Sequence, residues 1–142
     1  MVRGGRELLP EAVFYDDDND CFNRTYDLVM ASSSLQYCRD WRKAVRRLAS
    51  VSDSYLYITR LPLVCEAPSF VVVQRPHRYG YETEYLSWFL RRDEFLNYMN
   101  DLGTELIREF LIHEKSVVHG APEQGEYRGF LFRPQVDYLK NE

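Results

Sequence analysis

The sequence predicts an α/β fold with a mostly parallel sheet that ends in an antiparallel hairpin. The first observation is an apolar strand at residues 26–31, an amphipathic helical stretch at 40–50 and a second strand at 54–59. A strand, a crossover helix and a strand make a βαβ unit, which is parallel and right-handed. The second observation is the alternation of residues 105–113 and 127–133, which is typical of two paired strands.

The composition indicates one soluble domain. A length of 142 residues fits a single domain, and 45% apolar with 28% charged residues is ordinary for a globular protein. The net charge of −4 gives no reason to expect nucleic acid as a partner. The longest apolar run, residues 70–73, is far below the ~18 residues of a membrane span.

The three cysteines favour a reducing compartment. Cys21, Cys38 and Cys65 are odd in number and widely spaced, which fits neither a disulfide framework nor a zinc site. We therefore expect a cytoplasmic protein without a metal centre.

The first half of the chain is expected to alternate strands with one helix. Residues 12–15 form a short strand that ends at the acidic run 16–20. The nearly continuous apolar run at 26–31 predicts a strand buried on both faces. Asp40 can cap the helix that follows, and the strand at 54–59 should end at Arg60-Leu61-Pro62, because proline cannot continue a central ladder.

The second half adds a short strand at 69–74, a loop at 77–85, a helix at 93–102 ended by Gly103, and the terminal hairpin. The loop interleaves cations with aromatic residues: Arg75, His77, Arg78, Tyr79, Tyr81 and Tyr85. Such a pattern can stack on bases or sugars. A packed aromatic loop is the alternative reading.

Three stretches resemble one protein family in residue type and order. They are residues 26–37 followed by Asp40, residues 57–62 (Tyr-Ile-Thr-Arg-Leu-Pro), and residues 129–133 (Gly-Phe-Leu-Phe-Arg). Their order resembles the last five strands of class I, Rossmann-like methyltransferases that use S-adenosylmethionine, whose sheet order is 3-2-1-4-5-7-6 with the seventh strand antiparallel. With residues 69–74, they are most similar to a bacterial methyltransferase family known mainly from genome annotation.

The resemblance covers about residues 1–134 and implies a partial methyltransferase sheet made of family strands 3, 4, 5, 7 and 6. It implies one partial domain across residues 1–142. That domain consists of an N-terminal remnant (1–11), a strand-loop-strand-helix-strand core (12–60), an acceptor-side insert (61–92) and a helix with the terminal hairpin (93–134).

The resemblance also implies a cofactor site for S-adenosylmethionine. Asp16 and Asp17 would lie near the adenine, and a wall after the fourth family strand would consist of Ala31, Ser32 and Leu35. Carboxylates can accept from the adenine amine, and small residues let a flat ring approach the backbone. The alternatives are a solvated acidic turn for the aspartates and a helix entry for the serines around position 33.

On the acceptor side, the resemblance implies contacts from Arg60, His77, Tyr79 and Tyr81 to a small-molecule or glycan acceptor. The sequence identifies no catalytic residue. The family's glycine-rich loop and its ribose-binding acid have no counterpart, and Met1 falls just after the expected end of family strand two. We therefore expect a truncated chain. The alternative is a non-catalytic, methyltransferase-like remnant that acts as an interaction module.

Truncation would leave the strand at 26–31 as an apolar sheet edge, and such an edge invites pairing with another chain. We expect one of three outcomes. Residues 12–15 dock beside this edge, the chain self-associates through it, or the N-terminal segment is disordered.

Overall fold

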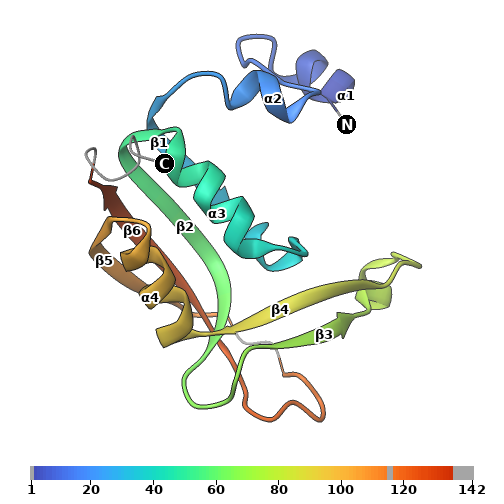
Figure 1. Cartoon of the computed structure of the whole chain (residues 1–142). Helices are drawn as coiled ribbons and strands as arrows, with labels where there is room; N and C mark the ends of the chain where they lie inside the picture. Colours follow the sequence, from blue (N-terminus) through green and yellow to red (C-terminus); the bar gives the residue numbers. More distant parts are fainter. Residues whose placement is uncertain (1, 115–116, 136–142) are drawn as a thin grey trace.

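The computed structural model describes residues 2–114 and 117–135, apart from the side chains of residues 78 and 79. This part of the chain forms one mixed six-stranded sheet with two longer helices (Figure 1). The elements, in chain order, are α1 (Val2–Leu8), α2 (Asp18–Cys21), β1 (Tyr26–Ser32), the 3₁₀ helix η1 (Leu35–Tyr37), α3 (Trp41–Ser50), β2 (Ser52–Val64), β3 (Phe70–Gln74), the 3₁₀ helix η2 (Pro76–Tyr79), β4 (Tyr85–Arg91), α4 (Arg92–Asp101), β5 (Thr104–Ile112) and β6 (Glu126–Pro134).

Strand β2 is the centre of the sheet. It runs parallel to β1 on one side and antiparallel to β6 on the other, and β6 pairs with β5 in an antiparallel hairpin. The resulting order β1-β2-β6-β5 is the order 4-5-7-6 that the resemblance implies. The predicted α/β class, the parallel βαβ unit and the terminal hairpin are confirmed.

The expected end of β2 at Arg60-Leu61-Pro62 is wrong, because the strand continues to Val64. Arg60 has a φ of 57°, and the pairing with β6 shifts register between Ile58 and Leu61. This bulge bends the strand and breaks the regular ladder, which makes proline two residues later tolerable. Beyond the bend, Leu63 and Val64 pair in parallel with β4.

Strand β4 is an element that the sequence reasoning missed. It pairs antiparallel with β3, and the two strands form a hairpin that projects from the rest of the sheet (Figure 1). At its base Phe70 and Phe89 lie opposite one another and stack, with ring centroids 5.4 Å apart. The hairpin falls within the segment expected as the acceptor-side insert.

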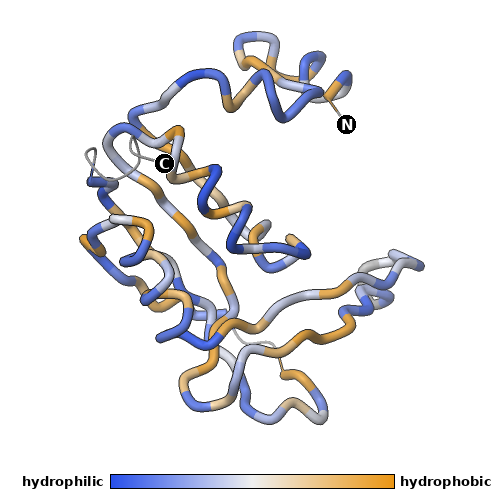
Figure 2. Tube along the Cα trace, in the orientation of Figure 1, coloured by the Kyte–Doolittle hydropathy of each residue, from blue (hydrophilic) through white to orange (hydrophobic). Residues whose placement is uncertain are grey.

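Helix α3 forms as the sequence predicts. The side chain of Asp40 accepts a hydrogen bond from the backbone N–H of Lys43 at 3.0 Å, which caps the helix. Trp41, Val45 and Ala49 are buried along one stripe, and hydrophilic residues follow the outer side of the helix (Figure 2). Trp41 packs edge-on against Tyr98 of α4, so the two helices share one hydrophobic core.

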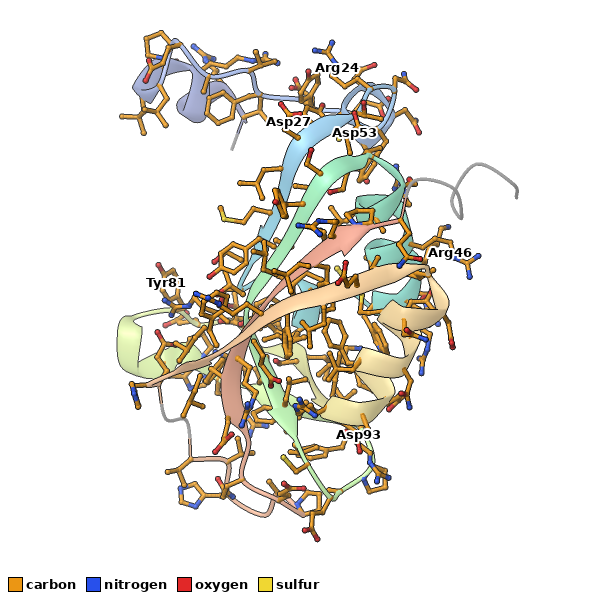
Figure 3. All side chains as sticks on the ribbon, turned by 90° about the vertical axis from the view of Figure 1, so that its left-hand side faces the viewer. Arg24, Asp27, Arg46, Asp53, Tyr81 and Asp93 are labelled. Carbon is orange, nitrogen blue, oxygen red and sulfur yellow. The ribbon has the colours of Figure 1, made fainter. Side chains whose placement is uncertain are left out.

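The predicted burial of β1 on both faces is wrong. Helices α3 and α4 lie on the same face of the sheet, as the side view shows (Figure 3). On the opposite face Leu28 is 56% and Met30 61% exposed, while Val29 and Ala31 are buried toward the helices. Other large side chains on this opposite face are Tyr55, Tyr57 and Phe110.

The predicted strand at residues 12–15 does not form. Among the described residues β1 pairs only with β2, so this segment has no strand beside it to supply backbone hydrogen bonds. The segment is held instead by Arg6, which donates to the carbonyl of Phe14 at 2.9 Å and to Asp16 at 2.8 Å. The expected docking of residues 12–15 beside β1 is therefore wrong, and helices α1 and α2 lie at the amino end of β1 (Figure 1).

None of the described helices is both long enough and apolar enough to cross a membrane.

The base of the hairpin is held to the loop between β5 and β6 by one carboxylate. Glu123 accepts hydrogen bonds from the backbone N–H groups of Cys65 and Glu66, each at 2.8 Å, and of Ala67 at 2.7 Å. These bonds, with that of Ala67 the strongest, hold the pKa of Glu123 below its ordinary value. The side chain thereby fixes the turn from which β3 starts.

This arrangement predicts an acid-sensitive contribution to stability. Because the folded-state pKa is lowered, the stabilisation is present above the unfolded-state pKa of ~4.3 and is lost as pH falls through the folded-state value. We expect the free energy of unfolding, measured by urea titration between neutral pH and pH 3, to fall less in Glu123→Gln than in the wild type. The control is Glu66→Gln, whose side chain makes no ion pair among the described residues. Equal pH dependence in Glu123→Gln and the wild type would contradict this role.

Candidate functional site

The chain turns sharply where β1 ends. Ser33 has a φ of 51°, in the left-handed region that a non-glycine residue rarely occupies. Its backbone N–H donates to the carbonyl of Thr59 on β2 at 3.0 Å, which holds this conformation. The turn directs residues 35–37 across the carboxyl end of the parallel strands, where open α/β sheets bind their ligands.

Helix η1 is joined to the β3–β4 hairpin through Tyr37. Its ring packs edge-on against Tyr85 with centroids 5.3 Å apart, and its hydroxyl donates to Gln74 Oε1 at 3.1 Å. Burial, followed by the neighbouring Tyr85, raises the pKa of Tyr37 above its ordinary value. Tyr37 therefore stays a neutral phenol at physiological pH and serves as a hydrogen-bond donor from η1 to the β3–β4 hairpin.

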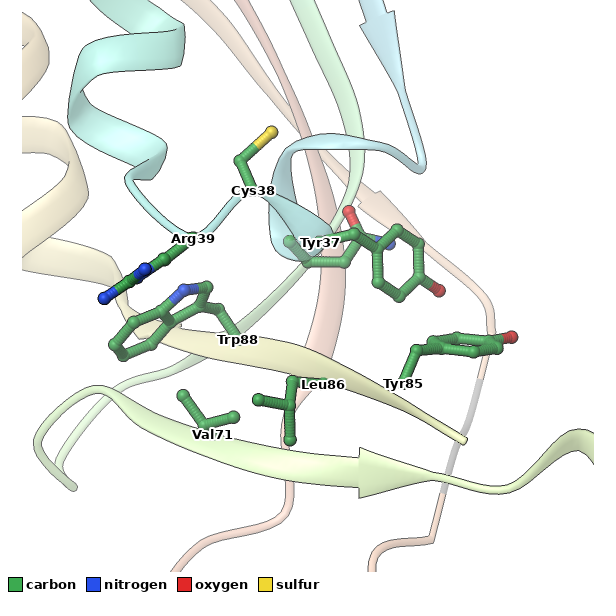
Figure 4. A pocket seen from close by; sticks show the side chains of 8 residues that line it. Tyr37, Cys38, Arg39, Val71, Tyr85, Leu86 and Trp88 are labelled. Atoms are coloured by element: carbon green, nitrogen blue, oxygen red, sulfur yellow. The ribbon is translucent and has the colours of Figure 1, made fainter. Parts of the chain in front are cut away.

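A cleft of about 640 Å³ opens between these two walls (Figure 4). One wall comes from η1 and the residues before α3, and the other from β3 and β4. Its lining residues are Gln36, Tyr37, Cys38, Arg39, Val71, Tyr85, Leu86 and Trp88. A volume of this size, with mostly aromatic and aliphatic walls and few polar groups, is typical of small-molecule sites.

Two polar side chains of the cleft have unused hydrogen-bonding capacity. Arg39 is exposed, lines the cleft as Trp88 does (Figure 4) and makes no ion pair among the described residues. Gln36 is only 2% exposed, and its amide nitrogen donates to Ser33 Oγ at 3.4 Å. Its Oε1 is buried and has no hydrogen-bond partner in the described part of the chain.

The three predicted wall residues lie together where β1 ends, but they face different ways. Ala31 is 8% and Leu35 3% exposed, and both belong to the hydrophobic core beneath α3. Ser32 is exposed as the last residue of β1, opposite Thr59. Of the three, Ser32 alone offers a side chain to solvent.

Asp16 and Asp17 are not brought to this wall. Asp16 is paired with Arg6 at 2.8 Å, and Asp17 caps α2 by accepting from Asn19 N at 2.8 Å. The next residue, Asp18, lies 3.4 Å from Arg47 near the C-terminal end of α3. That end of α3 lies at the amino end of β1 (Figure 1), so the acidic run and Ser32 are at opposite ends of the strand. The physical reason is that residues 12–15, which would carry the aspartates to the carboxyl end, are not part of the sheet.

None of the predicted acceptor-side residues is among those that line the cleft. Arg60 forms an ion pair with Glu114 at 2.8 Å, just beyond the end of β1. His77 is exposed on η2, and Tyr81 is 61% exposed and points away from the sheet (Figure 3). The side chain of Tyr79 lies outside the described residues. Sequence reasoning missed Arg39, Leu86 and Trp88, because the strand β4 that carries two of them was not predicted.

In the described part of the chain, no group of three or more His, Cys, Asp or Glu side chains is arranged to hold a metal ion.

No protein-family model matches the sequence, and no curated protein does. Solved structures do match. Magnesium protoporphyrin IX methyltransferase (ChlM) from Synechocystis PCC 6803, with bound SAM, has a TM-score of 0.56 and 14% identity over 94% of this chain and 52% of its own.

Two further structures are similar to the chain. The N-terminal domain of EvdMO1, in the presence of SAH and D-fucose, has a TM-score of 0.52 and 14% identity over 81% of this chain and 50% of its own. An S-adenosylmethionine-dependent methyltransferase from Clostridium acetobutylicum ATCC 824 has a TM-score of 0.51 and 11% identity, over 79% of this chain and 59% of its own.

The chain has the fold of a class I methyltransferase. It spans between half and three fifths of the length of these solved methyltransferases. At identities of 11–14%, the likeness concerns the fold alone.

The cleft is lined by one thiol, that of Cys38, and the structure predicts that it is less reactive at neutral pH than an exposed thiol. Burial raises the pKa of Cys38 above its ordinary value, so its thiolate, the nucleophilic form, is scarce. We expect the alkylation rate of Cys38 by iodoacetamide, followed by peptide mass spectrometry, to reach its half-maximal value at higher pH than that of a short cysteine peptide. Half-maximal alkylation at or below the pH found for the peptide would contradict this expectation.

Proposed function

We propose that this chain is the C-terminal part of an S-adenosylmethionine-dependent methyltransferase domain and that it supplies the acceptor cleft. One observation carries the proposal: the cleft lies between the turn that ends β1 and the β3–β4 hairpin, in a class I methyltransferase fold. In such sheets the carboxyl end of the strands is where ligands bind. The acceptor is a small molecule or a glycan.

The described residues fit only part of the cofactor. Ser32 and the turn at Ser33 offer a polar surface at the end of β1, where Ser33 Oγ accepts from the amide nitrogen of Gln36. The seven glycines of the sequence include no Gly-x-Gly spacing after a strand, and the acidic residues near position 16 lie at the other end of β1. We therefore assign no chemical step through the cofactor to this chain, and we identify no catalytic residue.

The chain's own contribution would be to position the acceptor. Methyl transfer depends strongly on holding donor and acceptor in line, and a missing general base does not exclude the class. The cleft walls are fixed to one another by Tyr37, which supports this positioning role. The divisions 1–11, 12–60, 61–92 and 93–134 stay part of the proposal, with no strand at residues 12–15, with the end of β2 inside the third division, and with the β3–β4 hairpin as the acceptor-side insert.

A bacterial, cytoplasmic setting is part of the same proposal. The free state of Cys21, Cys38 and Cys65 among the described residues supports the reducing compartment, and the bacterial source rests on the family resemblance alone.

The proposal predicts weak cofactor binding by these 142 residues alone. Because the chain offers no glycine-rich loop, we expect calorimetric titration with S-adenosylmethionine to give a dissociation constant weaker than ~0.1 mM. A longer product of the same gene that adds an in-frame Gly-x-Gly-x-Gly segment before Met1 should bind in the micromolar range. Micromolar binding by the 142 residues would show that they hold a complete site. A stop codon or unrelated sequence directly upstream would favour the second function below.

The second candidate function is that of a non-catalytic interaction module that self-associates through β1. The edge of β1 is unpaired among the described residues, and it carries the exposed apolar side chains of Leu28 and Met30. An apolar edge of this kind can pair with a strand of another chain. A second copy of this chain is the simplest occupant, because β1 could pair with itself about a two-fold axis.

We expect Met30→Lys to weaken this self-association, because a charge on an edge strand opposes pairing. Analytical ultracentrifugation across a concentration series should show a larger monomer fraction for this variant than for the wild type. Val73→Lys is the matched control, because Val73 is 47% exposed on the hairpin, away from the β1 edge. A wild-type chain that is monomeric at all concentrations, or an equal effect of both variants, would refute the edge as the interface.

A further inference from the structure

We propose that the cleft between η1 and the β3–β4 hairpin takes a flat, largely apolar ring that carries one anionic group, a carboxylate or a phosphate. The inference rests on the proposed function in that this ring compound would be the methyl acceptor. The side chains of the cleft narrow the class of acceptor. Three observations carry this inference: the aromatic walls, the guanidinium of Arg39 and the small number of polar groups.

The walls suit a flat ring. Tyr85, Leu86 and Trp88 come from β4 and Val71 from β3, while Tyr37 on η1 belongs to the opposite wall (Figure 4). Leu86 is 63%, Tyr37 42%, Val71 41% and Tyr85 38% exposed, so a ligand that enters the cleft removes this apolar surface from water. Aromatic side chains favour offset or edge-on contact with another ring.

The charge of the ligand follows from Arg39. Arg39 lines the cleft with Trp88, and its guanidinium makes no ion pair among the described residues, in contrast to Arg42 and Arg75, which pair with Glu94 and Glu84. No carboxylate is among the residues that line the cleft, so a cationic ligand finds no partner there. The neighbouring carboxylate of Asp40 is already engaged by the backbone N–H of Lys43. A planar guanidinium binds carboxylate or phosphate oxygens in pairs.

The scarcity of polar groups argues against a sugar. Each hydroxyl of a bound sugar loses water and needs a new partner, and an unpaired buried hydroxyl opposes binding. The cleft offers the guanidinium of Arg39, the amide of Gln36, the indole N–H of Trp88, the weakly donating thiol of Cys38 and two tyrosine hydroxyls, of which that of Tyr37 already donates to Gln74. This set can satisfy an anionic group and one further polar substituent, but not a ring of hydroxyls.

Gln36 indicates what that further substituent is. Its amide is buried and its Oε1 lacks a donor among the described residues, although the residue lines the cleft. A buried acceptor without a partner is unfavourable, so a ligand donor that draws the Gln36 amide toward the cleft relieves this cost. A ring hydroxyl is such a donor, so 4-hydroxybenzoate is a better probe of the cleft than benzoate.

The test is a titration of the ¹⁵N-labelled chain, without cofactor, monitored by the two indole N–H signals in a ¹H–¹⁵N correlation spectrum. The sequence has two tryptophans, Trp41 and Trp88, and Trp88→Phe assigns their signals. We expect 4-hydroxybenzoate to shift the Trp88 signal while the signal of Trp41, which is 2% exposed in the core, stays in place. Binding should weaken on the order of tenfold for 4-hydroxybenzamide, which lacks the charge. Benzoate and glucuronate should also bind more weakly.

The variants separate binding from folding. Arg39→Gln should abolish the preference for the acid over the amide, whereas Arg75→Gln, a matched change outside the cleft, should leave it intact. Gln36→Leu should remove the preference for 4-hydroxybenzoate over benzoate with little change in melting temperature, because the loss of the long 3.4 Å bond from its amide nitrogen to Ser33 Oγ is offset by the removal of an unpaired buried oxygen. A purely structural Gln36 would instead lower the melting temperature and leave the preference unchanged.

Several results would overturn the inference: equal binding of the amide and the acid, tighter binding of glucuronate, or a shift of Trp41 without Trp88. Because no titration contains S-adenosylmethionine, these results leave the proposed function standing. Conversely, if a longer gene product fails to bind S-adenosylmethionine, the proposed function is refuted, whereas the inferred ligand preference of the cleft is unaffected.

Discussion

Every part of this structure depends on the double pairing of β2. One edge of the strand is occupied by β6 along most of its length, while the other edge is shared between β1 in its first part and β4 in its last residues. The change of partner occurs at Arg60, where the left-handed conformation and the register shift bend the strand. Beyond this bend Leu63 and Val64 pair with β4, and the β3–β4 hairpin forms the wall of the cleft that faces η1.

The bend at Arg60 and the turn at Ser33 are two unfavourable backbone conformations that follow the same pair of residues. Ser32 and Thr59 are paired, and the residue after each of them, Ser33 beyond the end of β1 and Arg60 within β2, has a positive φ. Each conformation costs on the order of 1 kcal/mol or more, so the surrounding hydrogen bonds must hold it. Such local strain is common where a fold shapes a binding surface. The fully buried side chains of Leu56, Ile58 and Leu61 anchor β2 on both sides of the bend.

The elements that the sequence predicted are those whose local signals agree with their tertiary role. The periodicity of residues 41–49 and the cap at Asp40 predicted α3, and the alternation near the C-terminus predicted the β5–β6 hairpin. Pro62 led to a wrong end for β2, because a bulge that no local sequence pattern indicates allows the strand to continue past the proline. Residues 12–15 led to the opposite error, a predicted strand that does not form. Their side chains favour a strand, but the segment does not pair with β1. Of the cleft, the sequence indicated the wall that contains Tyr37, since it belongs to the family-like motif. The opposite wall depends on the pairing of Trp88 with Val71, which only the folded chain reveals.

The contact of Glu123 with the turn before β3 has a consequence for how this protein can diverge in sequence. Its carboxylate recognises three main-chain N–H groups and no side chain of residues 65–67. Substitutions at those three positions, proline excepted, leave the contact intact, whereas aspartate at 123 would fall short by one methylene. Related chains should therefore vary freely at residues 65–67 while keeping glutamate at position 123. The residue that fixes the conformation of this turn lies about 57 positions away from it in the sequence.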